Sequence, residues 1–365
     1  MFFEYIDGGS YDEVTLRRNL ADFEAIALRQ RVMRDMTRIS TEVQSLGQTM
    51  SMPIGLAPVG MAGMYARRGE VQAAQAAAAA GLPFCLSTVG VCSVEEVAAT
   101  GTPPWFQLYM LKDRGYMREL LARAKAAGCP VLVFTVDLPL PGARYRDARS
   151  GFTGATALSG LLNTLWQGAT HPAWAWDVYA GGRPHTLGNV QSAVQGGRRV
   201  NDFLAWIARN FDRTVTWKDI DFVREAWDGP IVIKGVLDVD DARDAVRAGA
   251  QGLIVSNHGG RQLDGVVSSI MALPRISEAV GDDLEVYLDG GVRSGLDVLK
   301  ALSLGAKACF IGRAWAYALG AGGEQMVTRM LSTLRNELVT AMILTGCDDV
   351  RTADRGLLEN LGKAI

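Results

Sequence analysis

Short, uninterrupted apolar runs alternate with longer amphipathic stretches along most of the chain. Apolar runs of four to six residues, bounded by glycine or polar residues, are typical of strands that are buried on both faces of a parallel sheet. The pattern predicts eight such strands, at residues 53–57, 83–87, 105–109, 131–136, 231–234, 252–256, 285–288 and 308–311. Amphipathic helices are predicted between them, including residues 115–127, 238–248 and 295–304.

Glycines mark where several predicted helices end, just before the next strand: Gly81, Gly128, Gly249 and Gly305. A glycine in the left-handed conformation commonly ends a helix and lets the chain turn back into a buried strand. Eight strand–helix units without a long polar break favour a closed (β/α)8 TIM barrel over a doubly wound sheet. We therefore expect one domain over residues 1–365.

One segment interrupts the alternation of predicted strands and helices. Residues 138–216, after the fourth predicted strand, form an insertion far longer than an ordinary βα loop. An insertion at the carboxyl end of a barrel strand is expected to act as a lid over the active site. Its large apolar residues could pack over the barrel mouth, meet a second subunit, or contact a membrane surface; they are Leu161, Leu162, Leu165, Trp166, Trp174, Trp176 and Tyr179.

Composition narrows the class of protein. Hydrophobic residues make up 48% of the 365, which is enough for a large core, and the net charge of −2 argues against nucleic-acid binding. The five cysteines are widely spaced and form no C-x-x-C pair, so we expect buried thiols in a reducing compartment and no metal site. The first residues do not resemble a signal peptide, and no apolar run reaches the roughly 20 residues of a membrane-spanning helix.

The strongest chemical signal is the stretch SNHGGRQLD at residues 256–264, directly after a predicted strand. In a barrel, this position lies at the catalytic face. His258 can accept a proton near neutral pH, and Arg261 can hold a carboxylate through two hydrogen bonds. A lone histidine is more often structural, but an adjacent arginine and two glycines favour a base that acts on an acidic substrate.

Two further loops resemble phosphate sites. The sequence DGGVR at residues 289–293 ends the seventh predicted strand, and Gly312 and Arg313 end the eighth. Backbone N–H groups and arginines after strands seven and eight form the usual phosphate site of TIM barrels, although a single D-G-G could be a plain turn. Lys234, at the end of the fifth strand, would be costly to bury without an anion.

With these motifs in place, the chain resembles the FMN-dependent 2-hydroxy acid dehydrogenase/oxidase family over nearly its whole length. The resemblance includes YIDGG (residues 5–9), LRRN (16–19), APVG (57–60), YARRGE (65–70), WFQLY (105–109), TVD (135–137) and GARYRD (142–147), together with the His258 motif. Among family members, the sequence is most similar to the bacterial respiratory L-lactate dehydrogenases, including the stretch around His171 and His185.

The resemblance implies a role for each matching residue. His258 would be the base and Asp137 would orient it. Arg144 and Arg261 would hold the substrate carboxylate, with help from Tyr5, and Tyr109 would contact the hydroxyl group. The FMN-binding set would be Val59, Gly60, Ser87, Gln107, Thr135, Lys234, Ser256, Asp289, Gly290, Gly291, Arg293, Gly312 and Arg313.

The same resemblance implies oxidation of L-lactate to pyruvate. Electrons would pass to a quinone acceptor. The protein would bind the cytoplasmic face of the bacterial inner membrane and would form a homotetramer. Gly60 favours quinone over oxygen, because oxidases of the family tend to carry alanine there, although small size alone could explain this glycine. The alternatives are a soluble oxidase that reduces O2 to hydrogen peroxide and a mandelate-type dehydrogenase. An unrelated phosphate-binding barrel would not need Asp137, His258 and Arg261 together.

Overall fold

The fold is a parallel eight-stranded barrel in a computed structural model that describes residues 2–152, 166, 168–194, 205–206 and 208–359. The strands are β3 (Ile54–Leu56), β4 (Cys85–Ser87), β5 (Trp105–Tyr109), β6 (Leu132–Thr135), β7 (Ile231–Val236), β8 (Gly252–Val255), β9 (Glu285–Asp289) and β10 (Ala308–Ile311). Their order is β3-β10-β9-β8-β7-β6-β5-β4, and a parallel bridge from Leu56 to Phe84 joins β3 to β4. The predicted (β/α)8 TIM barrel and all eight predicted strands are confirmed.

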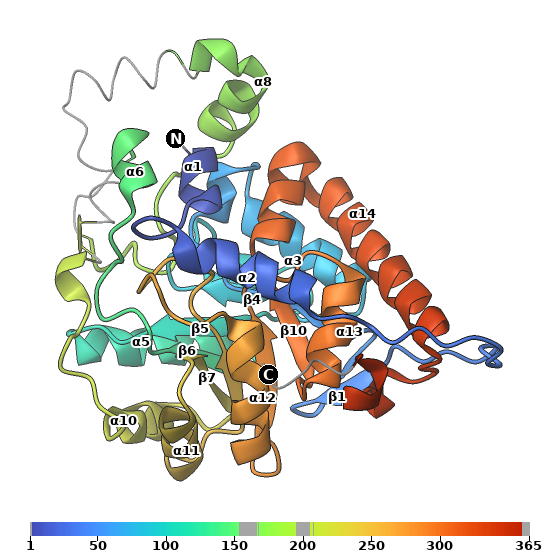
Figure 1. The fold of residues 1–365 in the computed structure, drawn as a ribbon. Helices are drawn as coiled ribbons and strands as arrows, with labels where there is room; N and C mark the ends of the chain where they lie inside the picture. The colour runs from blue at the N-terminus through green and yellow to red at the C-terminus, as the bar shows by residue number, and fades with distance from the viewer. Residues whose placement is uncertain (1, 153–165, 167, 195–204, 207, 360–365) are drawn as a thin grey trace.

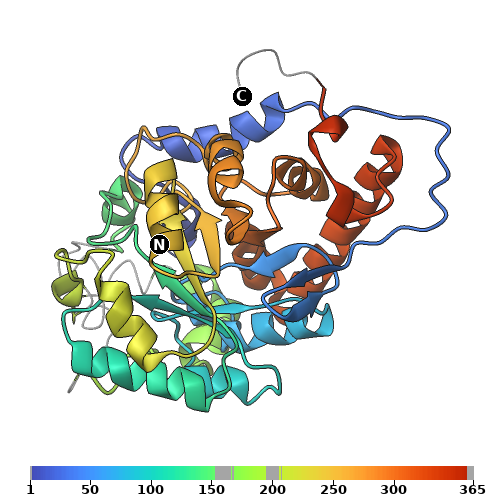
Figure 2. The same ribbon diagram turned by 90° about the horizontal axis from the view of Figure 1, so that it is seen from below.

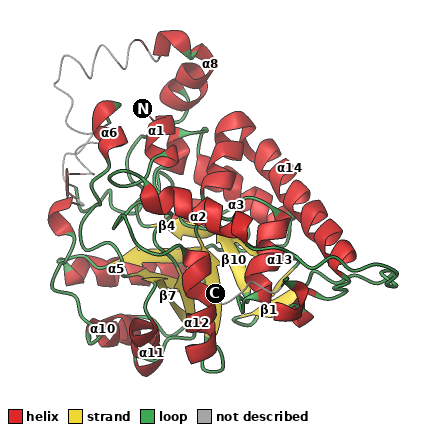
Figure 3. Ribbon diagram, viewed as in Figure 1, coloured by secondary structure: helices red, strands yellow, loops and turns green. Residues whose placement is uncertain are grey.

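Helices surround the barrel strands, as Figures 1 and 3 show. The main ones are α3 (Gly69–Ala79), α5 (Arg114–Ala126), α10 (Asp219–Ala226), α11 (Val239–Arg247), α12 (Ser269–Val280), α13 (Gly295–Ser303) and α14 (Arg313–Thr345). The glycines predicted to end helices all have positive φ, at +68° for Gly81, +77° for Gly128, +75° for Gly249 and +101° for Gly305. These angles explain why glycine, which lacks a Cβ, occupies each turn.

Three N-terminal features were not predicted. The hairpin β1 (Val43–Ser45) and β2 (Gln48–Met50) lies at the amino end of the barrel (Figure 2). There the Ser45 hydroxyl group hydrogen-bonds Glu285 and Tyr287. Helix α2 (Val14–Ala25) lies along the barrel beside α12. Helix α1 (Phe2–Asp7) lies at the opposite end from the hairpin, close to α6 (Tyr145–Arg149). The barrel mouth is therefore covered partly by the N-terminus.

The insertion contributes short helices, α6, α8 (Pro172–Trp174) and the π-helix η2 (Ala175–Ala180). Trp174 packs inward: its indole N–H donates to the Met64 carbonyl at 2.9 Å, and its ring lies 5.7 Å from that of Phe2. Trp176, two residues on, is 80% exposed. One member of this tryptophan pair thus packs against the barrel mouth, as one alternative predicted, whereas Leu161, Leu162 and Leu165 lie outside the described residues.

All five cysteines are buried free thiols. Within the described ranges, we find no helix with the length and apolar character to cross a bilayer.

Candidate active site

A cavity of about 340 Å³ lies at the carboxyl ends of the barrel strands, beneath α1. Its volume falls in the range of roughly 300–1,000 Å³ typical of sites for small molecules and cofactors. Of the predicted site residues, fourteen line it: Tyr5, Val59, Gly60, Tyr109, Arg144, Lys234, His258, Arg261, Asp289, Gly290, Gly291, Arg293, Gly312 and Arg313. The other five predicted residues are not part of the lining: Ser87, Gln107, Thr135, Asp137 and Ser256.

His258 and Asp137 form a close pair although 121 residues separate them in sequence. The distance from His258 Nδ1 to Asp137 Oδ1 is 2.9 Å, which leaves Nε2 as the other ring nitrogen. His258 has a φ of +57°, and its backbone N–H donates to Ser256 Oγ at 3.0 Å. A non-glycine residue held in the left-handed region commonly marks a functional site. The carboxylate fixes the imidazole tautomer with the proton on Nδ1.

The charges around this pair favour a neutral base. Burial lowers the pKa of His258; Asp137 opposes that effect, Lys234 adds to it, and the resulting pKa lies below the ordinary value of 6.5. Burial raises the pKa of Asp137, but its interaction with His258, which includes their hydrogen bond, and the charge of Lys234 outweigh this, so the pKa falls below its ordinary value. At neutral pH, the pair is therefore a neutral imidazole that accepts protons beside an ionised carboxylate.

Asp137 reaches His258 across the end of β7, where Gly235 leaves the necessary space. Gly235 has a φ of +109° and lies at a register shift between Lys234 and Val236, that is, at a β-bulge. A Cβ on Gly235 would lie 2.5 Å from Asp137 Cγ. This residue was not predicted as part of the site; its signal in the sequence is only a glycine that follows the predicted strand.

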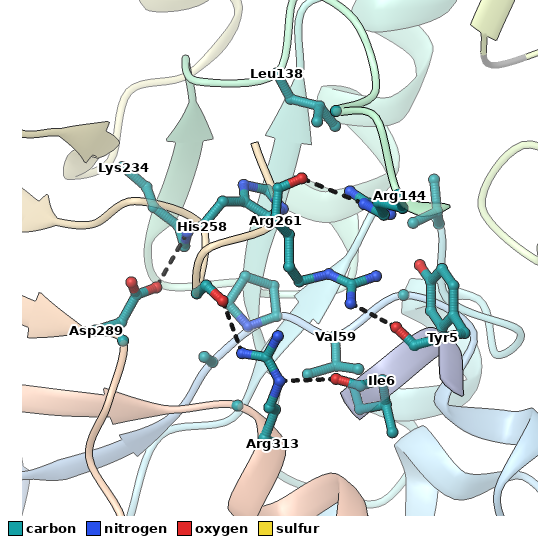
Figure 4. Close-up of a pocket in the computed structure, with 18 of the residues that line it drawn as sticks. Tyr5, Ile6, Val59, Leu138, Arg144, Lys234, His258, Arg261, Asp289 and Arg313 are labelled. Carbon is teal, nitrogen blue, oxygen red and sulfur yellow. Dashed lines mark hydrogen bonds and ion pairs between the residues drawn. The ribbon is translucent and has the colours of Figure 1, made fainter. Parts of the chain in front are cut away.

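Arg144 and Arg261 face the cavity without a carboxylate partner among the described residues (Figure 4). Arg144 Nε donates to the Arg261 carbonyl at 3.3 Å, and Arg261 Nη1 donates to the carbonyls of Tyr5 and Gly8. The Arg261 guanidinium also lies 4.7 Å from the centre of the Tyr5 ring. Burial, followed by repulsion from Arg261, lowers the pKa of Arg144 to about 10. Two adjacent cations, one buried and one half-buried, favour an anionic ligand.

Lys234 is buried and does not reach solvent. Its ammonium group lies 3.0 Å from Asp289 Oδ2 and donates to Ser256 Oγ at 3.0 Å. Burial lowers the pKa of Lys234, but Asp289 and Asp137 reverse this and the pKa rises above its ordinary value. A fixed positive charge therefore lies at this side of the cavity, beside His258 (Figure 4).

Buried polar atoms behind the cavity lack protein partners. Gln107 Oε1 accepts from Ser87 Oγ at 3.1 Å, but Gln107 Nε2 donates to no described residue. Thr135 Oγ1 is likewise buried and unpaired. Buried donors and acceptors in proteins are almost always satisfied, so unpaired ones beside a cavity indicate a polar ligand. An amide on β5 and a hydroxyl group at the end of the neighbouring β6 fit the polar edge of a flavin ring.

The two predicted phosphate arginines both line the cavity. Burial and then repulsion from Arg261 and Arg293 lower the pKa of Arg313 to about 9, and burial lowers that of Arg293. Arg313 donates to the carbonyls of Ile6, Gly8 and Gly259, each at 2.8 Å; Figure 4 shows the bond to Ile6. A guanidinium has five N–H donors, so two remain for an anion. The link from Arg313 to α1 was not predicted.

The walls of the substrate region are aromatic and come partly from the insertion. Phe211 lies edge-on to Tyr109, with 5.4 Å between ring centres, and Phe152 lies 4.8 Å from Tyr5. An antiparallel bridge from Leu111 to Phe211 fixes the returning end of the insertion beside β5. No local pattern in the sequence indicated Phe152 or Phe211, because their position depends on how the insertion folds back.

These features define a barrel oxidoreductase site with a base, an anion clamp and a place for a phosphorylated flavin. A family model described as FMN-dependent dehydrogenase matches residues 1–360. The chain is 40% identical to a solved mandelate oxidase, with a TM-score of 0.82 over 98% of this chain and 92% of that one. It is 39% identical to mandelate oxidase with (S)-4-hydroxymandelic acid (TM-score 0.84; 98% and 93% covered) and with benzoyl-formic acid (0.81; 98% and 92%).

The chain therefore belongs to the FMN-dependent dehydrogenase family. Its cofactor is FMN, and it is an oxidoreductase of 2-hydroxy acids.

Proposed function

We propose that this protein oxidises 2-hydroxy acids with a bulky apolar substituent, of the mandelate type, and passes the electrons to O2. The observation that carries the proposal is one cavity that combines the His258–Asp137 pair, two arginines without carboxylate partners, and aromatic walls. The similarity to mandelate oxidase supports the same substrate class. L-lactate as substrate and quinone as acceptor, expected from the sequence, gain no comparable support; membrane contact and a homotetramer stay predictions.

The substrate carboxylate binds between Arg144 and Arg261, because neither guanidinium group forms an ion pair with a carboxylate of the described residues, although Asp147 lines the same cavity. Tyr5 and Tyr109 line the same space and supply hydroxyl groups for the carboxylate and the substrate hydroxyl. Holding the carboxylate at two points fixes the orientation of the carbon that reacts. The substrate then presents its hydrogen toward His258.

His258 accepts the proton that leaves the substrate, from carbon or from the hydroxyl group. Asp137 stabilises the imidazolium that forms, since it is ionised and 2.9 Å away. A base placed in this way contributes roughly 10²- to 10⁴-fold to the rate. When bound, FMN supplies the two-electron redox chemistry that the side chains cannot perform.

FMN would be held by residues on three sides of the cavity. Gln107, Thr135 and Ser87 would bind the polar edge of its ring system, beside Val59 and Gly60. Lys234 would provide positive charge near that edge, and Ser256 and Asp289 would hold Lys234 and the ribityl chain. Arg293, Arg313 and the backbone of Gly290, Gly291 and Gly312 would bind the phosphate.

Cavity walls argue for a substituent larger than methyl. Val89, Leu138, Phe152 and Phe211 line the cavity around Tyr109 and present apolar surface. Aromatic rings favour edge-on or offset contact with another aromatic ring, and such contacts contribute about 0.5–1.5 kcal/mol beyond area burial. A phenyl substituent would use this surface, whereas a methyl group would leave most of it uncovered.

Gly60 does not favour quinone as the electron acceptor, because local packing alone explains why a glycine occupies this position. A Cβ on Gly60 would lie 2.7 Å from Val89 Cγ2, closer than real Cβ atoms approach their neighbours. Reduction of O2 to hydrogen peroxide balances the two electrons and two protons released by the hydroxy acid. We therefore base the acceptor on similarity to mandelate oxidase rather than on this glycine.

Anaerobic mixing of the FMN-loaded protein with (S)-mandelate, (R)-mandelate and L-lactate tests the substrate class through bleaching of flavin absorbance. We expect the fastest bleaching with a mandelate enantiomer. Faster bleaching with L-lactate would overturn the proposed substrate, and no bleaching with any 2-hydroxy acid would overturn the assignment of the site.

An oxygen electrode tests the acceptor separately. Rapid oxygen uptake with mandelate and stoichiometric hydrogen peroxide are expected. Slow oxygen uptake, together with mandelate oxidation that a soluble quinone analogue accelerates by orders of magnitude, would reject O2 in favour of quinone.

A further inference from the structure

The catalytic groups lie on two loops whose strands are not neighbours. His258 and Arg261 follow β8, whereas Asp137 and Arg144 lie on the loop between β6 and α6; β7 separates the two strands in the sheet. Residues 137–144 contain no helix or strand, so hydrogen bonds from elsewhere must fix their conformation. The geometry of the site therefore depends on a side chain that holds this loop against the loop that carries His258.

The Gln262 side chain makes three hydrogen bonds to that loop. Its Nε2 donates to the Asp137 carbonyl at 2.7 Å and to the Leu140 carbonyl at 3.0 Å. Its Oε1 accepts from the Gly142 backbone N–H at 3.0 Å. One half-buried amide thus binds the backbone at the start, the middle and near the end of residues 137–144.

Close packing brings this loop and the loop that carries Arg261 together at the same junction. A Cβ on Gly142 would lie 2.5 Å from the Arg261 carbonyl oxygen and 2.9 Å from that of Gln262. The hydrogen bond from Arg144 Nε to the Arg261 carbonyl lies at the same junction. Loss of the Gln262 amide would therefore release both Asp137 and Arg144, because they lie on the backbone that it binds.

We infer that Gln262 is a positioning residue that sets the Asp137–His258 distance and the Arg144–Arg261 spacing at the same time. The inference rests on the proposed function for the roles of these four residues. Gln262 itself bonds the loop backbone, so its effect on the reaction passes through Asp137 and Arg144. It differs from a purely structural residue in acting on proton transfer and substrate binding together.

Gln262→Met tests this inference, because methionine has a similar length but no amide. The control is Gln44→Met, since the Gln44 side chain also makes hydrogen bonds, to Thr49, but in the hairpin at the far end of the barrel. We expect Gln262→Met to lower kcat and raise KM together, with a 10- to 100-fold loss in kcat/KM, because displacements of about 1 Å can cost roughly 10²-fold. Gln44→Met should match the parent.

The pH profile provides a readout that a structural role would not move. The charged groups that face His258 are Asp137, Lys234 and Arg144, and only Asp137 raises its pKa. Retreat of Asp137 should lower the pKa of His258 further, so the acid limb of kcat/KM should move to lower pH in Gln262→Met. Hydrogen exchange of residues 137–144 should become roughly tenfold faster, whether or not substrate is present.

The outcomes separate this inference from the proposed function. If the parent oxidises 2-hydroxy acids and Gln262→Met equals Gln44→Met in kinetics, pH limb and exchange, Gln262 has no positioning role. If the parent oxidises no 2-hydroxy acid, the proposed function fails, and unchanged exchange of residues 137–144 would overturn the inference too. If Gln262→Met does not fold, Gln262→Asn, which keeps the amide on a shorter side chain, is judged by the same three criteria.

Discussion

Replacing Gly235 by alanine tests how the base and its carboxylate meet. The new Cβ would lie 2.5 Å from Asp137 Cγ, and ordinary carbon–carbon contact requires about 3.5 Å, so the carboxylate must retreat by about 1 Å. The Asp137–His258 distance of 2.9 Å would then lengthen to beyond hydrogen-bonding range. We expect the rate of flavin reduction to fall on the order of 10²-fold, which corresponds to about 2.7 kcal/mol.

A positive φ adds a separate cost in stability. Alanine at the φ of +109° found for Gly235 should lower the free energy of unfolding by about 1–3 kcal/mol. Gly101→Ala is the matched control, because Gly101 has a φ of +94° and a Cβ there would have no neighbour within 4 Å. It should lose stability without losing rate.

The assay is anaerobic stopped-flow reduction of the FMN-loaded proteins, alongside FMN content and thermal unfolding. If the rate of flavin reduction in Gly235→Ala lies within threefold of the rate in Gly101→Ala at equal FMN content, the close approach of Asp137 to Gly235 does not govern the rate. The geometric argument for the pair would then be wrong.

Three further predictions concern the base and the flavin site. His258→Gln should slow flavin reduction by at least about 10²-fold while FMN stays bound, because glutamine cannot accept the proton; a parental rate would exclude His258 as the base. Since the pKa of His258 lies below 6.5 and the neutral form is active, kcat/KM should be constant at neutral pH and, on the acid side, fall only as pH drops through that lower value; an acid limb with its midpoint above pH 7 would contradict this. Thr135→Val removes a hydroxyl that has no hydrogen-bond partner among the described residues, so FMN should bind roughly 2- to 12-fold more weakly, from about 0.5–1.5 kcal/mol for one hydrogen bond, while the FMN-free protein keeps or gains stability. Fluorescence titration and thermal unfolding check this, and unchanged FMN affinity would remove Thr135 from the site.

Barrel strands were predictable because each is buried on both faces, so its sequence is an apolar run that needs no partner to be identified. The hairpin β1–β2 and helix α1 were not, because they are short and depend on contacts with the ends of the barrel. Helix α1 covers the cavity through the Ile6 and Gly8 carbonyls that Arg313 binds, a contact between residues about 300 positions apart.

For the site, the sequence alone determined which side chains lie at the catalytic face, since the carboxyl ends of parallel strands meet at one end of a barrel. His258, Arg261, Lys234 and Arg293 were identified in this way. Only the tertiary structure decided how these side chains are paired, which cations lack a carboxylate, and which wall the insertion supplies through Phe211. Pairing depends on distances of about 3 Å between segments far apart in the chain, and local sequence patterns carry no information at that scale.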